Sequence, residues 1–280
     1  NAQGLVENVQ ILSSNLVQNG NFSEEGVQEI SNGSFSQEGS EVIVNGDFAT
    51  DTDWDGQATI SNGQLTKNDN GLVRQYTLDV SVKSYKVIVD VEILGSSLSV
   101  YLGGVNQLLS QGVNTIYMQS GGSNNLVGFN NGANSVINSI SCVEVGQNWT
   151  LGTGWSIGED KATFDETIGG AGNLNQGNIL TVGKTYKLTF DTLETNGGNL
   201  AYAFGNNSVF INNIQADTTH VVYGVADDVF LKIRGASNFN GSITNISVKE
   251  VGQNWVLGTG WSIGDDKAVA NTTGDFVNLY

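Results

Sequence analysis

Two stretches of this chain are nearly identical, and they divide it into modules. Val145–Ala162 reads VGQNWTLGTGWSIGEDKA and Val251–Ala268 reads VGQNWVLGTGWSIGDDKA, with differences only at residues 150/256 and 159/265. The stretches begin roughly 100 residues apart, a typical domain size. Repetition of this kind builds length and several contacts rather than one deep active site. The sequence therefore predicts a leader at 1–41, module 1 at 42–145, module 2 at 146–251 and the start of a third module at 252–280.

The third module is incomplete in this sequence. Tyr280 lies roughly a quarter of the way into it, by the same domain length. We expect either that the chain is a piece of a longer polypeptide or that a neighbouring chain completes the module.

A shorter repeat occupies the leader. Asn19–Phe22, Asn32–Phe35 and Asn45–Phe48 share the pattern Asn-Gly-x-Phe, recur every 13 residues and each follow a short apolar stretch. A unit of this size is too small to bury a core of its own. One interpretation is a strand–turn unit that stacks on its neighbours or on another chain. The other is a flexible polar leader, and in either case the third copy also begins module 1.

Alternation of apolar and polar residues predicts strands. Tyr85, Val87, Val89, Val91 and Ile93 alternate with polar or outward residues, and Tyr186, Leu188 and Phe190 repeat the pattern in module 2. Period-two alternation is typical of a strand with one face on the core. The chain has 37 glycines and no proline, so Asn-Gly and other Gly-rich steps must make the turns. The predicted fold class is all-β, with tandem β-sandwich (jelly-roll) modules behind a short repetitive leader.

Charge and cysteine content limit the partners. Eleven Lys and Arg against 28 Asp and Glu give a net charge of −17. Nucleic-acid affinity depends on neutralising phosphates, so we expect no nucleic-acid partner. No apolar run is long enough to predict a membrane-spanning helix. The single cysteine, Cys142, aligns with Val248, which predicts a buried small apolar residue rather than a nucleophile.

Three segments resemble a known family. They are NGDFATDTDW at Asn45–Trp54, VGKTYKLTFDT at Val182–Thr192 and FNGSITNISVKEV at Phe239–Val251. Together they look like carbohydrate-binding-module-like jelly rolls of the family 4/9 type, akin to galactose-binding-like domains, which recur in tandem in structural and fibre proteins of tailed bacteriophages. The resemblance implies an eight- or nine-stranded jelly roll. It also implies glycans stacked on exposed aromatic rings and a calcium ion near the N-terminal strands.

Aromatic residues are the candidate glycan contacts, because a flat ring covers the apolar side of a sugar. We expect Trp54, Trp155 and Trp261 to be core residues, and the alignment matches Trp54 with Trp155. Trp149 and Trp255 fall at the module junctions, and the start of module 1 offers no equivalent tryptophan in the sequence alignment. The predicted glycan-binding residues are Trp149, Trp255, Tyr101 and Tyr202, although packing between modules is the simpler expectation for the two tryptophans.

One acidic segment has the spacing of a calcium loop. Asp51, Asp53, Asp55 and Gly56 follow the D-x-D-x-D-G pattern, and Asp47 offers a further ligand from the preceding strand. The twelfth position is Asn62 rather than the bidentate Glu, and no helical pattern flanks the segment. Calcium is thus the one cofactor considered, and a solvated acidic turn is the alternative.

The sequence offers little for catalysis. His220 is the only histidine, and no nucleophile elbow of the G-x-S-x-G type is present. We therefore expect a non-enzymatic protein: a fibre, spike or decoration protein of a bacteriophage virion. It would reside on the virion surface with sister chains and other virion proteins as partners, by analogy with trimeric fibres, and would contact host-surface glycans. The alternative is a secreted or cell-surface carbohydrate-binding array or adhesin.

Overall fold

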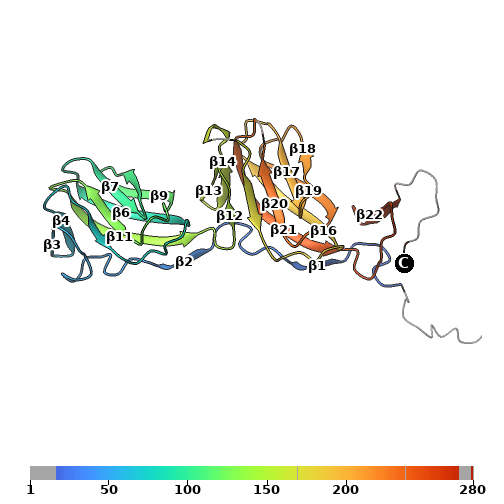
Figure 1. Cartoon of the computed structure of the whole chain (residues 1–280), viewed down its shortest axis with the longest axis horizontal. Helices are drawn as coiled ribbons and strands as arrows, with labels where there is room; N and C mark the ends of the chain where they lie inside the picture. Colours follow the sequence, from blue (N-terminus) through green and yellow to red (C-terminus); the bar gives the residue numbers. More distant parts are fainter. Residues whose placement is uncertain (1–16, 169, 237, 271–278, 280) are drawn as a thin grey trace, which may run out of the picture.

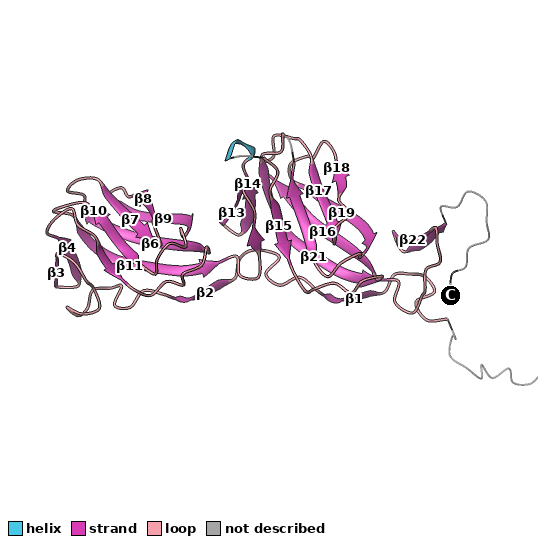
Figure 2. Cartoon of the chain, in the orientation of Figure 1, coloured by secondary structure: helices cyan, strands magenta, loops and turns pink. Residues whose placement is uncertain are grey.

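The computed structural model describes residues 17–168, 170–236, 238–270 and 279. These residues form two β-sandwiches and the start of a third, arranged in a row (Figures 1 and 2). Within the described residues, strands account for nearly all regular structure, and the one 3₁₀ turn, η1, lies at Glu166–Ile168. The all-β prediction is therefore confirmed. No helix in the described part of the chain has the length and apolarity needed to cross a membrane.

Module 1 is built from two antiparallel sheets. The first has the order β3-β4-β11-β6-β9, and β2 of the leader pairs with β11. The second has the order β5-β10-β7-β8. The strands are β2 (Glu38–Glu41), β3 (Ala58–Ser61), β4 (Gln64–Lys67), β5 (Val73–Gln75), β6 (Ser84–Ile93), β7 (Leu98–Leu102), β8 (Val105–Leu108), β9 (Gly112–Gln119), β10 (Val127–Asn131) and β11 (Val136–Val145).

Module 2 repeats this plan. Its first sheet has the order β13-β14-β21-β16-β19, with β1 of the leader paired to β21, and its second has the order β12-β15-β20-β17-β18. The strands are β1 (Glu25–Gln28), β12 (Thr150–Leu151), β13 (Trp155–Gly158), β14 (Lys161–Phe164), β15 (Asn173–Gln176), β16 (Thr185–Leu193), β17 (Leu200–Phe204), β18 (Val209–Ile211), β19 (Thr218–Val225), β20 (Leu231–Gly235) and β21 (Gly241–Val251).

The third module is present as a hairpin and a bridge. The hairpin joins β22 (Trp261–Gly264) and β23 (Lys267–Ala270) and corresponds to β13–β14 of module 2. An isolated antiparallel bridge joins Leu257 to Leu279, in the way that β12 pairs with β15. The third copy of the repeat thus begins the same sandwich fold.

Burial follows the predicted alternation up to Val91, whereas Ile93, which was predicted on the same inward face, is 50% exposed at the end of β6. In β6 the side chains of Tyr85, Val87, Val89 and Val91 are buried, and β16 shows the same pattern. Cys142 is fully buried in the core of module 1, as predicted, and burial raises the pKa of its thiol. In the β3–β4 turn, Asn62 and Gly63 both have positive φ, which is the geometry expected of an Asn-Gly hairpin.

The described part of the leader, together with the third repeat copy that begins module 1, contributes to both cores; this segment, residues 17–48, is called the leader from here on. Ile43 and Phe48 belong to the core of module 1, whereas Ile30 and Phe35 belong to the core of module 2. Figure 1 shows the leader, in blue, running along one side of both sandwiches. The second and third repeats are thus not free-standing units: each supplies a strand and two apolar side chains to a sandwich.

Replacing a leader phenylalanine should therefore destabilise a distant module. Phe35 is 2% exposed, so Phe35→Ala should lower the free energy of unfolding of module 2 by about 3–5 kcal/mol. Urea denaturation followed by tryptophan fluorescence measures this, because Phe35 lies against Trp149. The matched control is Val27→Ala, at a leader side chain that is 77% exposed; it should change stability by less than about 0.5 kcal/mol. Equal stability of the two variants would contradict a core role for Phe35.

Candidate functional site

The leader binds the modules by adding a strand to the closing strand of each. β1 pairs antiparallel with β21 of module 2, and Glu25 lies opposite Val251. β2 pairs antiparallel with β11 of module 1, and Glu38 lies opposite Val145. The two strands pair in the same register, because Val145 and Val251 occupy the same position in the two near-identical stretches. This is strand addition within one chain, in which backbone hydrogen bonds provide affinity and side chains provide specificity.

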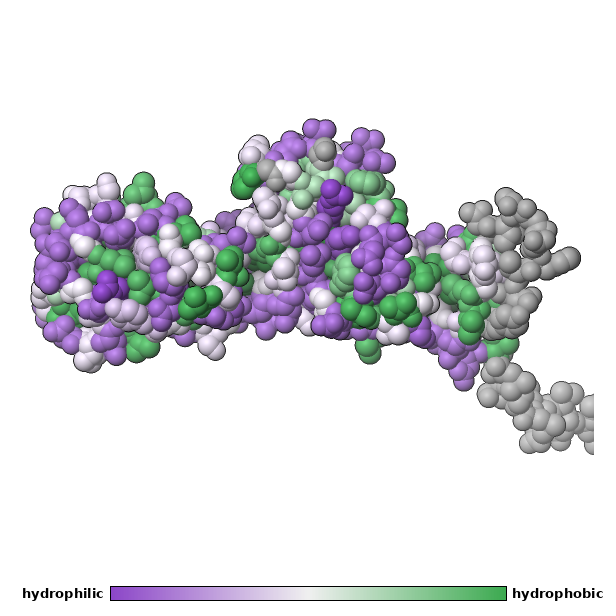
Figure 3. Space-filling model, viewed as in Figure 1, coloured by the Kyte–Doolittle hydropathy of each residue, from purple (hydrophilic) through white to green (hydrophobic). Residues whose placement is uncertain are grey.

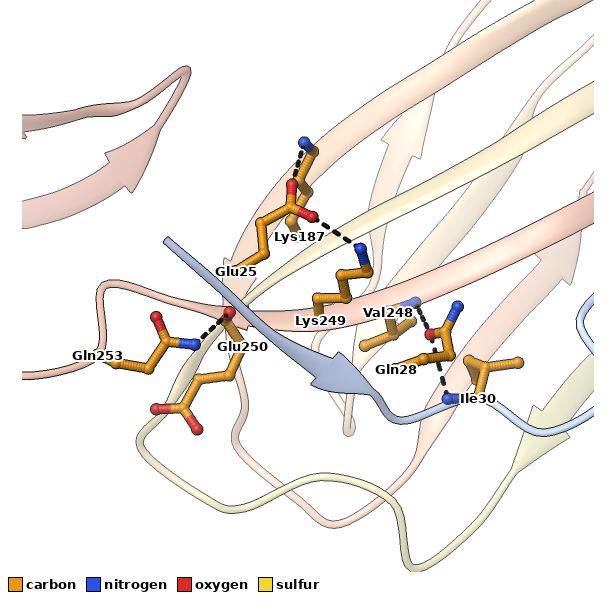
Figure 4. A network of polar contacts seen from close by, with 8 residues as sticks. All are labelled: Glu25, Gln28, Ile30, Lys187, Val248, Lys249, Glu250 and Gln253. Atoms are coloured by element: carbon orange, nitrogen blue, oxygen red, sulfur yellow. Dashed lines mark hydrogen bonds and ion pairs between the residues drawn. The ribbon is translucent and has the colours of Figure 1, made fainter. Parts of the chain in front are cut away.

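A leader side chain completes the hydrogen bonding where each ladder is irregular. The Gln28 side-chain oxygen accepts hydrogen bonds from the backbone N–H groups of Ile30 at 3.3 Å and Val248 at 2.7 Å (Figure 4). In module 1 the Glu41 carboxylate accepts the same two bonds, from Ile43 at 2.9 Å and Cys142 at 2.8 Å. Backbone N–H groups in the interior need partners, so this acceptor continues the pairing just beyond the register shift.

Ion pairs hold the start of each leader strand. The Glu25 carboxylate lies between Lys187, at 2.6 Å, and Lys249, at 2.9 Å (Figure 4). Hydrogen bonds from these two ammonium groups lower the pKa of Glu25. Glu38 makes the equivalent pair with Lys86 at 2.7 Å, and this hydrogen bond raises the pKa of Lys86. Glu25 thus has two cationic partners on module 2, whereas Glu38 has one on module 1.

The Asn-Gly-x-Phe tetrapeptides form three copies of one turn, the leader turn. In each copy the Asn and the Phe have positive φ, and the Phe N–H donates to the Asn carbonyl. The Asn side-chain oxygen accepts a backbone N–H five residues later. Asn tolerates positive φ better than most residues, which explains its place in the repeat. The backbone hydrogen bond to the Asn carbonyl and the bond to the Asn side chain thus both hold the turn in its positive-φ conformation.

Each leader turn receives one tryptophan. The indole N–H donates to the carbonyl of the turn Asn, and the ring packs against the turn Phe. The pairs are Trp255 with Asn19 and Phe22, Trp149 with Asn32 and Phe35, and Trp54 with Asn45 and Phe48, with indole–carbonyl distances of 3.0, 3.0 and 3.2 Å. The first leader repeat thus contacts the third module, the second contacts module 2 and the third contacts module 1. The order along the leader is the reverse of the order of the modules.

This grouping corrects the alignment of the tryptophans. The prediction that Trp54 matches Trp155 is wrong, because Trp54 makes the contacts of Trp149 and Trp255. Trp155 instead donates its indole N–H to the Gly172 carbonyl and packs against Phe164, with 3% of its surface exposed. Its predicted core position is thus confirmed. The misalignment arose because the segment before β3 differs in sequence from the segment before β13.

In the second and third leader turns the glycine touches the closing strand. The Gly33 carbonyl accepts the Ile246 N–H at 2.9 Å, and the Gly46 carbonyl accepts the Ile140 N–H at 2.8 Å. A Cβ atom at Gly33 would lie 2.0 Å from the Ile246 oxygen, and one at Gly46 would lie 2.2 Å from the Ile140 oxygen. Only glycine permits this approach. Among the described residues, Gly20 of the first turn meets no such strand, and a Cβ there would approach Val17 at 3.3 Å.

The nearly identical stretches form the module junctions. Tyr117 of β9 lies against Gly158 of β13, where a Cβ would fall 2.6 Å from the Tyr117 ring. Tyr223 of β19 lies in the same way against Gly264 of β22, at 3.3 Å. A cleft lies beside each junction, and each cleft contains a Lys–Glu pair at 2.9 Å: Lys83 with Glu144, and Lys184 with Glu250. The junction between modules 1 and 2 and the junction between module 2 and the third module therefore have the same contacts.

The predicted glycan residues do not form one platform. Trp149 and Tyr202 are 9% and 8% exposed and belong to the core of module 2. Trp255 is half-buried, and its indole ring already contacts Asn19 and Phe22 of the first leader turn. Tyr101 is half-buried on β7 of module 1, and its hydroxyl accepts a hydrogen bond from Asn124 at 2.8 Å. The four side chains are spread over both modules and the start of the third.

The structure does not group the predicted calcium ligands. In the described part of the chain, no three His, Cys, Asp or Glu side chains are grouped so that they could hold a metal ion, so the structure does not bring Asp47, Asp51, Asp53 and Asp55 together. Asp55 pairs with Arg74 and the Tyr76 hydroxyl, both at 2.9 Å, and the Tyr76 hydrogen bond followed by the Arg74 charge lowers its pKa. Asp47 and Asp53 accept local turn hydrogen bonds instead. The arrangement is that of a solvated acidic turn.

Comparison with known proteins adds no family. No family model and no curated protein matches the chain. Among solved structures, allantoicase from Saccharomyces cerevisiae has 9% identity and a TM-score of 0.29, covering 71% of this chain and 78% of that one. An isomalto-dextranase of Arthrobacter globiformis T6, complexed with panose, has 10% identity and a TM-score of 0.20, covering 67% of this chain and 36% of that one. Similarity at this level carries no argument about function.

A methyl group on the leader glycine should disrupt the second leader contact. Gly33→Ala forces a Cβ against the Ile246 carbonyl and should cost about 2 kcal/mol or more. Hydrogen exchange of the β1 and β21 amides measures the loss of protection. Gly20→Ala is the matched control, since it makes the same change in a leader turn without that contact. Protection that is equal in the two variants would show that the glycine is not required.

Acidification should weaken the β1 contact. The pKa of Glu25 in the folded protein lies below its ordinary value of 4.5, so its stabilising effect is complete above that pH and is lost as the pH falls through the folded-state pKa. Between about pH 6 and pH 3 the protein should lose about 0.5–1 kcal/mol more stability than Glu25→Gln, a size typical of a partly exposed ion pair. Urea titrations at several pH values measure the difference. The neighbouring variant Glu24→Gln should follow the unsubstituted protein; if Glu25→Gln does so too, the ion pairs do not hold the leader.

Proposed function

We propose that this chain is a non-enzymatic structural rod that holds module 1 at a distance from its point of attachment. The observation that supports this is the reversed order of the leader contacts. Because the first leader turn binds at Trp255 and the third binds at Trp54, the start of the described leader and the third module lie at one end, the base. Module 1 lies at the opposite end, the tip (Figure 1).

The junctions favour a stiff rod over a flexible string of modules. The joint between modules 1 and 2 is crossed by two chain segments: the leader between β1 and β2, and the chain between β11 and β12. The Tyr117–Gly158 contact adds a third point of support. A joint held at three separate points resists bending in every direction, whereas a single linker does not. The visible surface of the rod is mainly hydrophilic, with scattered apolar patches (Figure 3).

Within this proposal, the rod is a fibre, spike or decoration protein of a bacteriophage virion. The tandem sandwiches, the leader that fastens them and the sequence resemblance support it. Sister chains and other virion proteins are the proposed partners, and host-surface glycans are the proposed target of the tip. The proposal includes no catalytic role: the ring of His220, the only histidine in the sequence, stacks on Phe190 at 5.0 Å.

Distance measurements between the modules test the rod. Spin labels on Asn62→Cys, in the β3–β4 turn, and Val182→Cys, in an exposed loop of module 2, report across the junction. Cys142 is fully buried and does not compete for the label. We expect one narrow distance distribution for the protein and a broader one for the same pair with Gly33→Ala. A broad distribution in the protein itself would contradict the rod.

Detection on particles tests the virion assignment separately. Mass spectrometry and antibody labelling of purified virions should find the chain as a stoichiometric component. If the chain occurs only as a free secreted protein, and glycan arrays give a tight ligand for a single module, the carbohydrate-binding alternative replaces the virion assignment. That outcome would not contradict the proposed rod geometry.

A further inference from the structure

We propose that the leader is a tension strap, which carries force along its length between the tip and the base; this rests on the proposed rod. The leader runs the length of both modules and is continuous with module 1 at the tip. It is attached to module 2 through β1 and the second leader turn. A pull on module 1, away from the base, therefore reaches module 2 by two routes: the short connection after β11 and the leader.

The direction of the hydrogen bonds makes the leader strong along its own axis. In an antiparallel ladder the hydrogen bonds run perpendicular to the strands. A pull along the leader therefore strains all the bonds of one repeat together, including the Glu29 N–H to Val248 carbonyl bond at 2.9 Å and the Ile246 N–H to Gly33 carbonyl bond at 2.9 Å. A sideways pull on the start of the leader strains them one after another. The same contacts should thus resist the first pull far better than the second.

The glycine contacts prevent the leader from sliding. If the leader slipped by one residue along β21, Asn32 or Ser34 would take the place of Gly33. Either residue would bring a Cβ to a position where the Ile246 oxygen lies 2.0 Å away. Gly46 blocks slippage on β11 in the same way, with the Ile140 oxygen at 2.2 Å. Sliding requires these turns to leave the closing strands completely, so each leader glycine acts as a stop against axial movement.

The side chains that enter the cores add to the resistance. Ile30 and Phe35 are buried in module 2, and Ile43 and Phe48 are buried in module 1. Axial movement would have to withdraw all four from their cores. Gly33 and Gly46 are 13 residues apart along the chain, so the segment that joins them cannot extend beyond about 45 Å. Tension between the modules is thus taken up by a segment of limited length that is anchored at both ends.

Single-molecule force spectroscopy in two geometries tests the strap. In the axial geometry, handles on Asn62→Cys and Val182→Cys pull the tip away from the base. In the peeling geometry, handles on Ser23→Cys and Val182→Cys pull the exposed start of the leader away from module 2. Peeling should release the leader in two steps of about 4.5 nm, one per repeat, at a rupture force several-fold below the axial one. Equal rupture forces in the two geometries would overturn the proposal.

Matched variants show whether the leader is the element that resists. Gly33→Ala should lower the axial rupture force severalfold, whereas Gly20→Ala should leave it unchanged. If Gly33→Ala has no effect on the axial force, the leader does not carry it. The two proposals fail differently: a narrow distance distribution with equal rupture forces removes only the strap, whereas a broad distribution removes the rod itself.

Discussion

The close approach of a leader glycine to a closing strand is the contact on which the rest of this architecture depends. Because Gly33 and Gly46 lie directly on the carbonyls of Ile246 and Ile140, the second and third leader turns can each bind in one register only. That register places the turn Phe in the core and the turn Asn carbonyl under the indole N–H of a tryptophan. The Asn-Gly-x-Phe pattern thus follows from three requirements: positive φ, absence of a Cβ and an apolar anchor. Because β1 and β2 pair at equivalent positions of module 2 and module 1, the leader fixes how the two modules follow one another along the row.

The pattern of divergence between the modules has a physical reason. The near-identical stretch contains the residues that meet a neighbour on two sides, namely the leader turn at Trp149 or Trp255 and the preceding module at Gly158 or Gly264. A change there must suit two surfaces at once. Core residues elsewhere meet one sandwich interior, which tolerates replacement at constant volume, as Cys142 and Val248 illustrate. The sequence of the joint is therefore repeated almost unchanged, whereas the sandwiches share their strand order with many more differences in sequence.

Local patterns predicted most of the fold and little of the site. The alternation in β6 and β16, the Asn62-Gly63 turn and the burial of Cys142 and Trp155 all depend on neighbouring residues, so the sequence was sufficient. The leader pairing joins β1 to β21, more than 200 residues away, and no local signal gives that partner. The 13-residue period was the available signal, since its apolar positions are the anchors. Aromatic residues suit cores and sugars alike, so Trp149 and Tyr202 were predicted as ligand contacts although both are buried. The D-x-D-x-D-G spacing indicated calcium because it carries no information about Arg74, the partner that Asp55 has.

The most direct test of this account is zero-length carbodiimide cross-linking of the native protein, followed by mass spectrometry. The reagent joins only carboxylates and amines that are in contact, and Glu25 and Glu38 lie on successive leader repeats. The reversed order predicts cross-links from Glu25 to Lys187 and Lys249, and from Glu38 to Lys86. Cross-links from Glu38 to Lys187 or Lys249, or from Glu25 to Lys86, would mean that the leader follows the modules in chain order. They would contradict the pairing from which the rod and its strap are derived.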